Sequence, residues 1–120
     1  MATAARDPRM TMPIYQVKAE FFRTLGHPAR IRVLEVLQAG ERPVGELIPE
    51  VGIEASHLSQ QLGVLRRGGL LETRKEGSSV VYSIRDPALV ELLAVAKRIL
   101  INSLSHSQGL LAGLKSGGRR

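Results

Sequence analysis

The sequence predicts a mainly helical domain with one small β-hairpin, which places it in the α+β class. Three observations support this prediction. Apolar residues recur at helical spacing through most of the 120 residues. The stretch "LLETRKEGSSVVYSI" instead contains two short runs with β-branched residues on either side of a glycine, as a hairpin does. A hydrophobic content of 43% at this length is ordinary for a single globular domain.

Two helices are predicted at the start of the domain. The first covers residues 13–25, where apolar side chains recur at helical spacing. Gly26 can end this helix, and Pro28 suits the first turn of the next one. His27, which lies between them, is predicted to cap the helix or turn the chain rather than to bind a ligand. The second helix is expected to stop near Gly40.

A short third helix and a longer fourth helix follow. The third lies in "RPVGELIPEVG", where Pro49 removes one backbone donor and is expected to end the helix early. The fourth covers residues 55–67, and Gly68 and Gly69 break it. At about 100° per residue, three leucines of the fourth helix share one stripe, which we expect to face the core. These are Leu58, Leu62 and Leu65.

A β-hairpin is predicted after the fourth helix, with its turn at Gly77. Alternate residues of its second strand share one face: Val80, Tyr82 and Ile84. The folded domain is expected to cover residues 13–114. Residues 1–12 are predicted to be disordered, and residues 115–120 to form a flexible basic tail.

The last helix is predicted to begin with Asp86 as its N-cap and Pro87 in its first position. If it runs unbroken to Leu114, it is roughly 40 Å long at ~1.5 Å per residue. That length exceeds the width of a small domain, so part of its apolar face would overhang the core. We expect the overhang to pack against the same helix of a second subunit. The alternative is a break near residues 103–109, with the helix folded back on its own domain.

The third helix, the turn "VGIEAS" and the fourth helix are predicted to form a helix-turn-helix, with the hairpin as its wing. In such a unit the second helix lies in the major groove of DNA. Its polar face carries hydroxyl, imidazole and amide groups, which match the donors and acceptors of base edges, while Gly63 permits close approach. The residues predicted to contact DNA through this face are Ser56, His57, Ser59 and Gln60. The residues predicted to neutralise phosphates are Arg66, Arg67, Arg74 and Lys75.

The overall composition agrees with a polyanionic partner. The chain has 17 Lys+Arg against 11 Asp+Glu, and its net charge of +6 favours nucleic acid or an anionic membrane surface. No stretch approaches ~18 uninterrupted apolar residues, and the N-terminus lacks the apolar core of a secretory signal. We therefore expect a cytoplasmic protein without a membrane partner. The chain has no cysteine, which excludes disulfides and thiolate metal sites.

With these elements in this order, the chain resembles the ArsR/SmtB family of bacterial winged-helix repressors. The resemblance spans about Phe21 to Ile84. The segments that carry it are "FFRTLGHPARIRVLEVL", "PVGEL", "VGIEASHLSQQLGVLRRGGLL" and "TRKEGSSVVYSI". It implies a nucleoid-associated homodimer that binds an inverted repeat in a promoter until a signal releases it. It also implies an interface on the first and last helices, here predicted at Phe21, Leu89, Leu93, Leu100 and Leu104.

The chain departs from the family at its metal sites. Many members bind metals through cysteines on the helix before the turn, where this chain reads "VGELIPEV". Others use an Asp, two His and a further His or Glu on the last helix. Asp86 is present here, but the other positions hold Ala88, Ile99 and Asn102. Four ligands close a zinc site and one remains, so no metal site of either type and no cofactor is expected. A site at His106 across a dimer stays open as a minor alternative.

Two further alternatives concern function. A winged helix can also serve as a protein- or RNA-interaction module without promoter specificity. The signal that would release a repressor stays open too, since an unidentified small-molecule effector or none at all would fit the sequence. An enzyme is not expected, because the chain has no P-loop, no Gly-rich dinucleotide turn, no HExxH motif and no Cys nucleophile.

Overall fold

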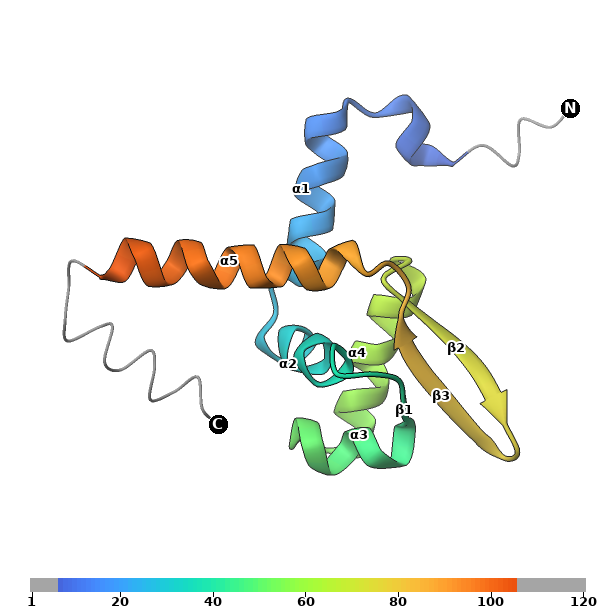
Figure 1. Ribbon diagram of the computed structural model, residues 1–120. Helices are drawn as coiled ribbons and strands as arrows, with labels where there is room; N and C mark the ends of the chain where they lie inside the picture. The colour runs from blue at the N-terminus through green and yellow to red at the C-terminus, as the bar shows by residue number, and fades with distance from the viewer. Residues whose placement is uncertain (1–6, 106–120) are drawn as a thin grey trace, which may run out of the picture. The chain divides into compact units, whose positions relative to one another are not determined.

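The computed structural model of the protein describes residues 7–105. The chain forms two compact units, divided between Arg85 and Asp86. The second unit contains α5 (Ala88–Leu104). The elements of the first unit, in order, are η2 (Pro8–Thr11), α1 (Ile14–Leu25), α2 (Pro28–Leu37), β1 (Arg42–Pro43), α3 (Val44–Val51), α4 (Ala55–Arg67), β2 (Leu71–Glu76) and β3 (Ser79–Ile84) (Figure 1).

The core of the first unit lies where α2, α3, α4 and the sheet meet. The predicted stripe of α4 is confirmed, because its three leucines are each at most 1% exposed. They pack with apolar side chains of the neighbouring elements. The other nearly or fully buried members of this core are Val33, Leu34, Leu37, Leu47, Leu71 and Val81. One face of α4 is therefore fixed against the body of the unit, and the opposite face is left outside.

The turn between α3 and α4 is made by Gly52, whose φ of 83° lies in the left-handed region that glycine adopts without strain. The expectation that Pro49 ends α3 early is wrong, since the helix continues to Val51. The proline ring removes one hydrogen bond, to the carbonyl of Gly45. Gly45 is exposed, so solvent can satisfy that carbonyl. The helix-turn-helix is thus complete despite the internal proline.

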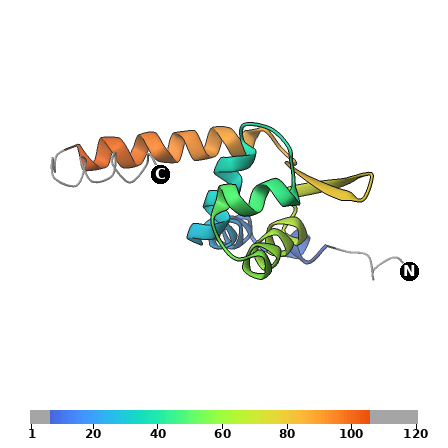
Figure 2. The ribbon, with the colours of Figure 1, turned by 90° about the horizontal axis from the view of Figure 1, so that it is seen from below.

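The wing is the hairpin of β2 and β3, which turns at Gly77 with a φ of 65°. Figure 2 shows it extending away from the helices of the first unit. The sheet has a third strand that the sequence did not predict: β1 pairs antiparallel with β3 through Arg42 opposite Tyr82 and Pro43 opposite Val81. Two residues with a proline carry no strand pattern, and proline is tolerated here because β1 is an edge strand.

The sequence placed Val80, Tyr82 and Ile84 on one face of β3 without indicating which face is buried. All three are half-buried, and Val81, between Val80 and Tyr82, is the buried residue of the strand. Periodicity shows which residues share a face of a strand. It cannot show which face a helix will cover.

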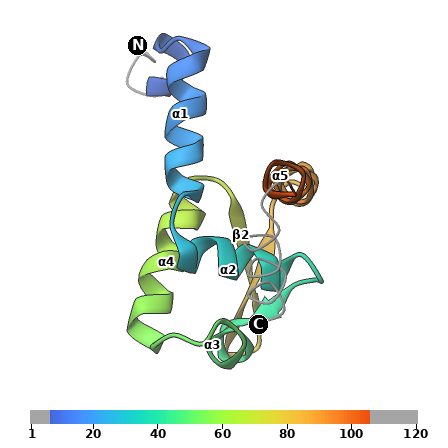
Figure 3. The same ribbon diagram turned by 90° about the vertical axis from the view of Figure 1, so that its left-hand side faces the viewer.

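Helix α1 ends at Leu25 with Gly26 as its C-cap, as predicted, and of its side chains only Leu25 is buried. Figure 3 shows α1 extending away from α2, α3 and α4. Ahead of it, Asp7 accepts a hydrogen bond from the Arg9 backbone N–H at 2.9 Å and starts the single turn of η2. This turn lies within the segment predicted to be disordered. Residues 1–6 of that segment lie outside the described residues.

Helix α5 starts at Ala88 with Pro87 as its N-cap, one residue later than predicted. Asp86 accepts a hydrogen bond from the backbone N–H of Ala88 at 2.9 Å, and Pro87 has helical dihedral angles. The helix covers 17 residues and ends at Leu104. It is about 26 Å long at ~1.5 Å per residue. Its end falls inside residues 103–109, where the sequence allowed a break as the alternative to an unbroken helix. Residues 106–114 lie outside the described residues. None of the helices in the described part is long and apolar enough to cross a membrane.

Candidate nucleic-acid interface

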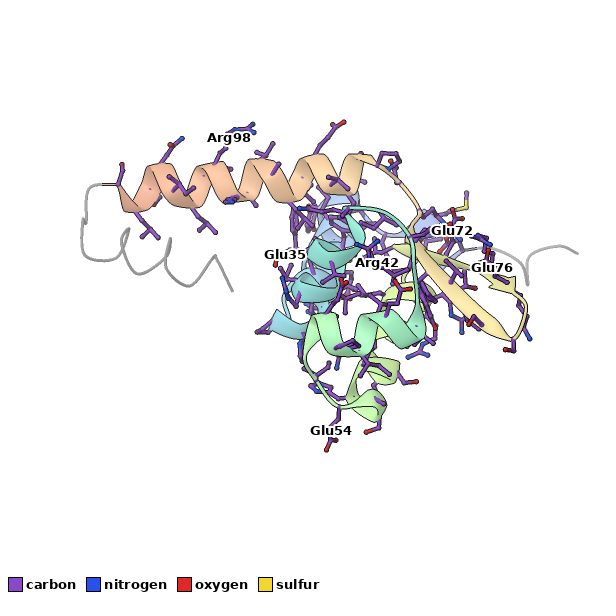
Figure 4. All side chains as sticks on the ribbon, turned by 60° about the horizontal axis from the view of Figure 1, so that its bottom comes forward. Glu35, Arg42, Glu54, Glu72, Glu76 and Arg98 are labelled. Carbon is purple, nitrogen blue, oxygen red and sulfur yellow. The ribbon has the colours of Figure 1, made fainter. Side chains whose placement is uncertain are left out.

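The outer face of α4 presents an array of short polar side chains. Ser56, Ser59 and Gln60 are exposed, while His57 is half-buried. Within residues 7–105, no side-chain hydrogen bond occupies the hydroxyl or amide groups of the three exposed residues. Glu54, which precedes the helix, points outward from the same end of α4 (Figure 4). The hydroxyl groups of Ser56 and Ser59 and the amide group of Gln60 are therefore free to bind an external partner.

Helix α4 is held in place by a hydrogen bond as well as by its leucines. Gln61, the one buried polar residue of the described chain, is 6% exposed. Its side-chain oxygen accepts a hydrogen bond from Nε of Arg30 at 2.8 Å. Nη1 of Arg30 also donates to the backbone carbonyl of Thr24 at 3.1 Å. Arg30 thus ties the end of α1 to the middle of α4, and this fixes the rotation of α4 about its own axis.

The two histidines of the first unit lie together at the start of α2. His27 Nδ1 accepts a hydrogen bond from the backbone N–H of Ala29 at 3.1 Å, which confirms its predicted capping role. The ring of His57 on α4 meets that of His27 edge to face, with centroids 6.1 Å apart. His57 therefore lies nearer the body of the unit than Ser56, Ser59 or Gln60. Spacing along one helix could not show this contact.

The basic residues differ in their surroundings. Arg66, Arg67 and Lys75 are exposed and, among the described residues, make no ion pair. Arg74 is different. Its guanidinium donates to both carboxylate oxygens of Glu41, at 2.6 and 3.2 Å, and it lies 3.7 Å from Glu76. The sequence singled out Arg74 for phosphate binding but gave no sign of a partner 33 positions away.

The wing as a whole carries little free positive charge. The hydrogen bonds that Arg74 donates to Glu41 lower the pKa of Glu41 and raise the pKa of Arg74, so both groups stay charged at neutral pH. Glu72 and Glu76 also lie on the hairpin (Figure 4), and Glu72 is 4.0 Å from Arg85. The pairing favours a wing that contacts DNA weakly.

Releasing Arg74 is expected to strengthen that contact. In Glu41→Gln the guanidinium loses its ionic partner and becomes available to a phosphate. The affinity for duplex DNA at low salt should rise, and the plot of log affinity against log salt should steepen by about one unit. Fluorescence anisotropy over a salt series measures both. Glu76→Gln is the matched control, because its more distant carboxylate should change the slope less. An unchanged slope in Glu41→Gln would show that Arg74 does not reach DNA.

The described residues contain no group of three or more His, Asp or Glu side chains that could hold a metal ion. Asp86, the one family-type ligand position that the sequence retains, caps α5. His106 lies outside the described residues.

A helix-turn-helix with an exposed polar second helix and a hairpin wing defines a winged-helix DNA-binding regulator. A family described as "Helix-turn-helix domain" matches residues 25–74. The chain is 53% identical over 107 residues to Rv0081 of Mycobacterium tuberculosis, an HTH-type transcriptional regulator, covering 88% of this chain and 94% of the relative. The chain belongs to the ArsR/SmtB family of helix-turn-helix transcriptional regulators, as the resemblance indicated. It is a family of regulators and not of enzymes.

Solved structures agree with the fold. The crystal structure of Rv0081 matches with a TM-score of 0.74 at 55% identity, over 79% of this chain and 96% of that one. The homodimeric winged helix-turn-helix domain of Mb0332 from Mycobacterium bovis matches with a TM-score of 0.70 at 29% identity, over 88% and 95%. These two structures confirm the predicted fold class.

A further relative by sequence is the biofilm growth-associated repressor of Xylella fastidiosa, which is 40% identical over 75 residues, or 62% of this chain and 66% of that protein.

Proposed function

We propose that the protein is a promoter-specific repressor that acts as a homodimer on an inverted-repeat operator, with α4 in the major groove of each half-site. The observation that carries this proposal is the exposed face of Ser56, Ser59 and Gln60, whose hydrogen-bonding groups have no partner in the described chain. Exposed hydroxyl and amide groups form hydrogen bonds either with solvent or with a partner such as the base edges of DNA. Their position on the second helix of a helix-turn-helix favours base edges.

The proposed dimer is supported by apolar side chains left exposed on both helices of the predicted interface. Exposed on α1 are Ile14, Tyr15 and Phe22, and exposed on α5 are Val95, Ile99 and Leu100. Mb0332, which has the same fold, is homodimeric. Of the residues predicted from sequence, Leu100 is 53% exposed and suits an interface, whereas Leu89 at 6% has little surface left to offer. Phe21 is half-buried, with its ring 5.3 Å from the exposed ring of Phe22.

Repression, rather than activation, is favoured by a relative's function. The biofilm growth-associated proteins of Xylella fastidiosa and Agrobacterium fabrum, each 40% identical to this chain, are repressors. A dimer that places two α4 helices about 34 Å apart, one turn of DNA, would cover a promoter segment and exclude polymerase by occupancy.

Gln60→Ala tests base reading. We expect it to weaken binding to the protein's own operator by about 1–3 kcal/mol, because an amide group that can pair with an adenine edge is lost. Binding to unrelated duplex should not change, because the charge of the protein is unchanged. Competition binding with operator and scrambled duplexes measures the two affinities. An equal loss on both duplexes, or no loss on either, would instead favour a winged-helix module that binds protein or RNA without promoter specificity.

A further inference from the structure

The side chain of Arg67 lies back along α4 and covers Gly63. A Cβ atom placed on Gly63 would be 3.0 Å from Nη1 of Arg67, and 3.6 Å from both Cζ and Nη2. The guanidinium therefore occupies the space that a side chain at Gly63 would fill. Helical side chains point toward the N-terminus of their helix, so this direction is the favoured one for a residue four positions on. Gly63 makes the close approach possible.

This conformation changes where the charge of Arg67 lies along the helix. At ~1.5 Å per residue, Gly63 is about 10 Å from Ser56 along the axis, while the backbone of Arg67 is about 17 Å away. The guanidinium over Gly63 is therefore about one helical turn nearer to Ser56 and Gln60 than the backbone of Arg67 is, and it lies on the face of α4 that they share. With that face directed into the major groove, the guanidinium would point to base edges together with Ser56 and Gln60.

We propose that Arg67, held over Gly63, reads a guanine in each half-site, in place of the phosphate contact that the sequence predicts. The planar fork of an arginine donates two parallel hydrogen bonds to O6 and N7 of guanine, the commonest specific contact in the major groove. Among the described residues, no carboxylate pairs with Arg67. The inference rests on the proposed function, because it requires α4 to lie in the major groove.

Arg66 provides the matched comparison. It is adjacent, carries the same charge, is also exposed and has no ion pair among residues 7–105. Unlike Arg67, it does not lie over a glycine of the outer face. Arg66 is about 100° around the helix from Arg67, so its guanidinium is directed away from the stripe of Ser56, Gln60 and Gly63. We expect Arg66 to contact a phosphate of the DNA backbone and not a base.

The test is selection of bound duplexes from a random library by the full-length wild type, Arg67→Ala, Arg66→Ala and Gly63→Ala. Wild type should select a motif with one strongly preferred guanine in each half-site. Arg67→Ala should lose that single preference and keep the others. Gly63→Ala should weaken the same preference, because its methyl group displaces the guanidinium, while circular dichroism shows an intact helix. Arg66→Ala should lower affinity for all sequences alike and leave the motif unchanged.

A second probe addresses the contact itself. Replacing the preferred guanine by 7-deazaguanine removes the N7 acceptor and should weaken wild-type binding at least about fivefold, with no further loss in Arg67→Ala. A motif that keeps its guanine in Arg67→Ala, or an unchanged preference in Gly63→Ala, would overturn this inference while leaving the proposed function intact. A wild-type protein that selects no motif would contradict the proposed function first and this inference with it.

Discussion

Leu62→Ala is expected to lower the free energy of unfolding by about 2–5 kcal/mol. Leu62 is 1% exposed and stands between the other two leucines that fix α4 to the core. Truncation removes buried methyl groups and leaves a cavity that the surrounding helices can close only in part. The loss is a large share of the ~5–15 kcal/mol that stabilises a typical domain.

Urea denaturation followed by circular dichroism measures this change. All variants must be compared at one protein concentration, because dimerisation adds to apparent stability. Gln60→Ala is the control on the same helix. Its side chain is exposed, so stability should stay within about 0.5 kcal/mol of the wild type. A stable Leu62→Ala would mean that the leucine stripe does not hold α4 to the body, and the orientation of the polar face would lose its physical basis.

Leu100→Glu is expected to convert the dimer into a monomer. The side chain is 53% exposed in the single chain, so a charge there should be tolerated by the isolated subunit. In a packed seam between two α5 helices the same carboxylate would be desolvated without a partner. Leu93→Glu is less informative, because Leu93 is half-buried within the chain and its loss would disturb the subunit itself.

Analytical ultracentrifugation reports the mass of each variant. The affinity for an operator with two half-sites should fall about 100-fold or more in Leu100→Glu, while the affinity for one half-site should not change. Arg98→Glu is the control, because Arg98 lies about 160° around α5 from Leu100 and is exposed (Figure 4). It makes an even larger charge change on the opposite face. If Leu100→Glu sediments like the wild type, the interface does not include that position.

Local patterns predicted most of the elements correctly. Glycines end helices and capping aspartates start them, so Gly26, Gly68 and Asp86 were placed to within a residue of their observed roles. The leucine stripe of α4 was also predictable, because burial of one helical face requires that periodicity. The errors came where a wider context decides. Pro49 was tolerated inside α3, and β1 has no pattern of its own because its hydrogen bonds come from β3.

The amino-acid sequence by itself determined the winged helix-turn-helix and which face of α4 is polar, because periodicity and turn residues are local properties of the chain. Only the tertiary structure decided what those polar and basic groups have around them. It placed Glu41 against Arg74, His27 against His57, and Arg30 against the buried Gln61. Each of these pairs joins residues far apart in the sequence. Whether a polar or basic side chain is available to DNA depends on which distant residues the folded chain brings next to it.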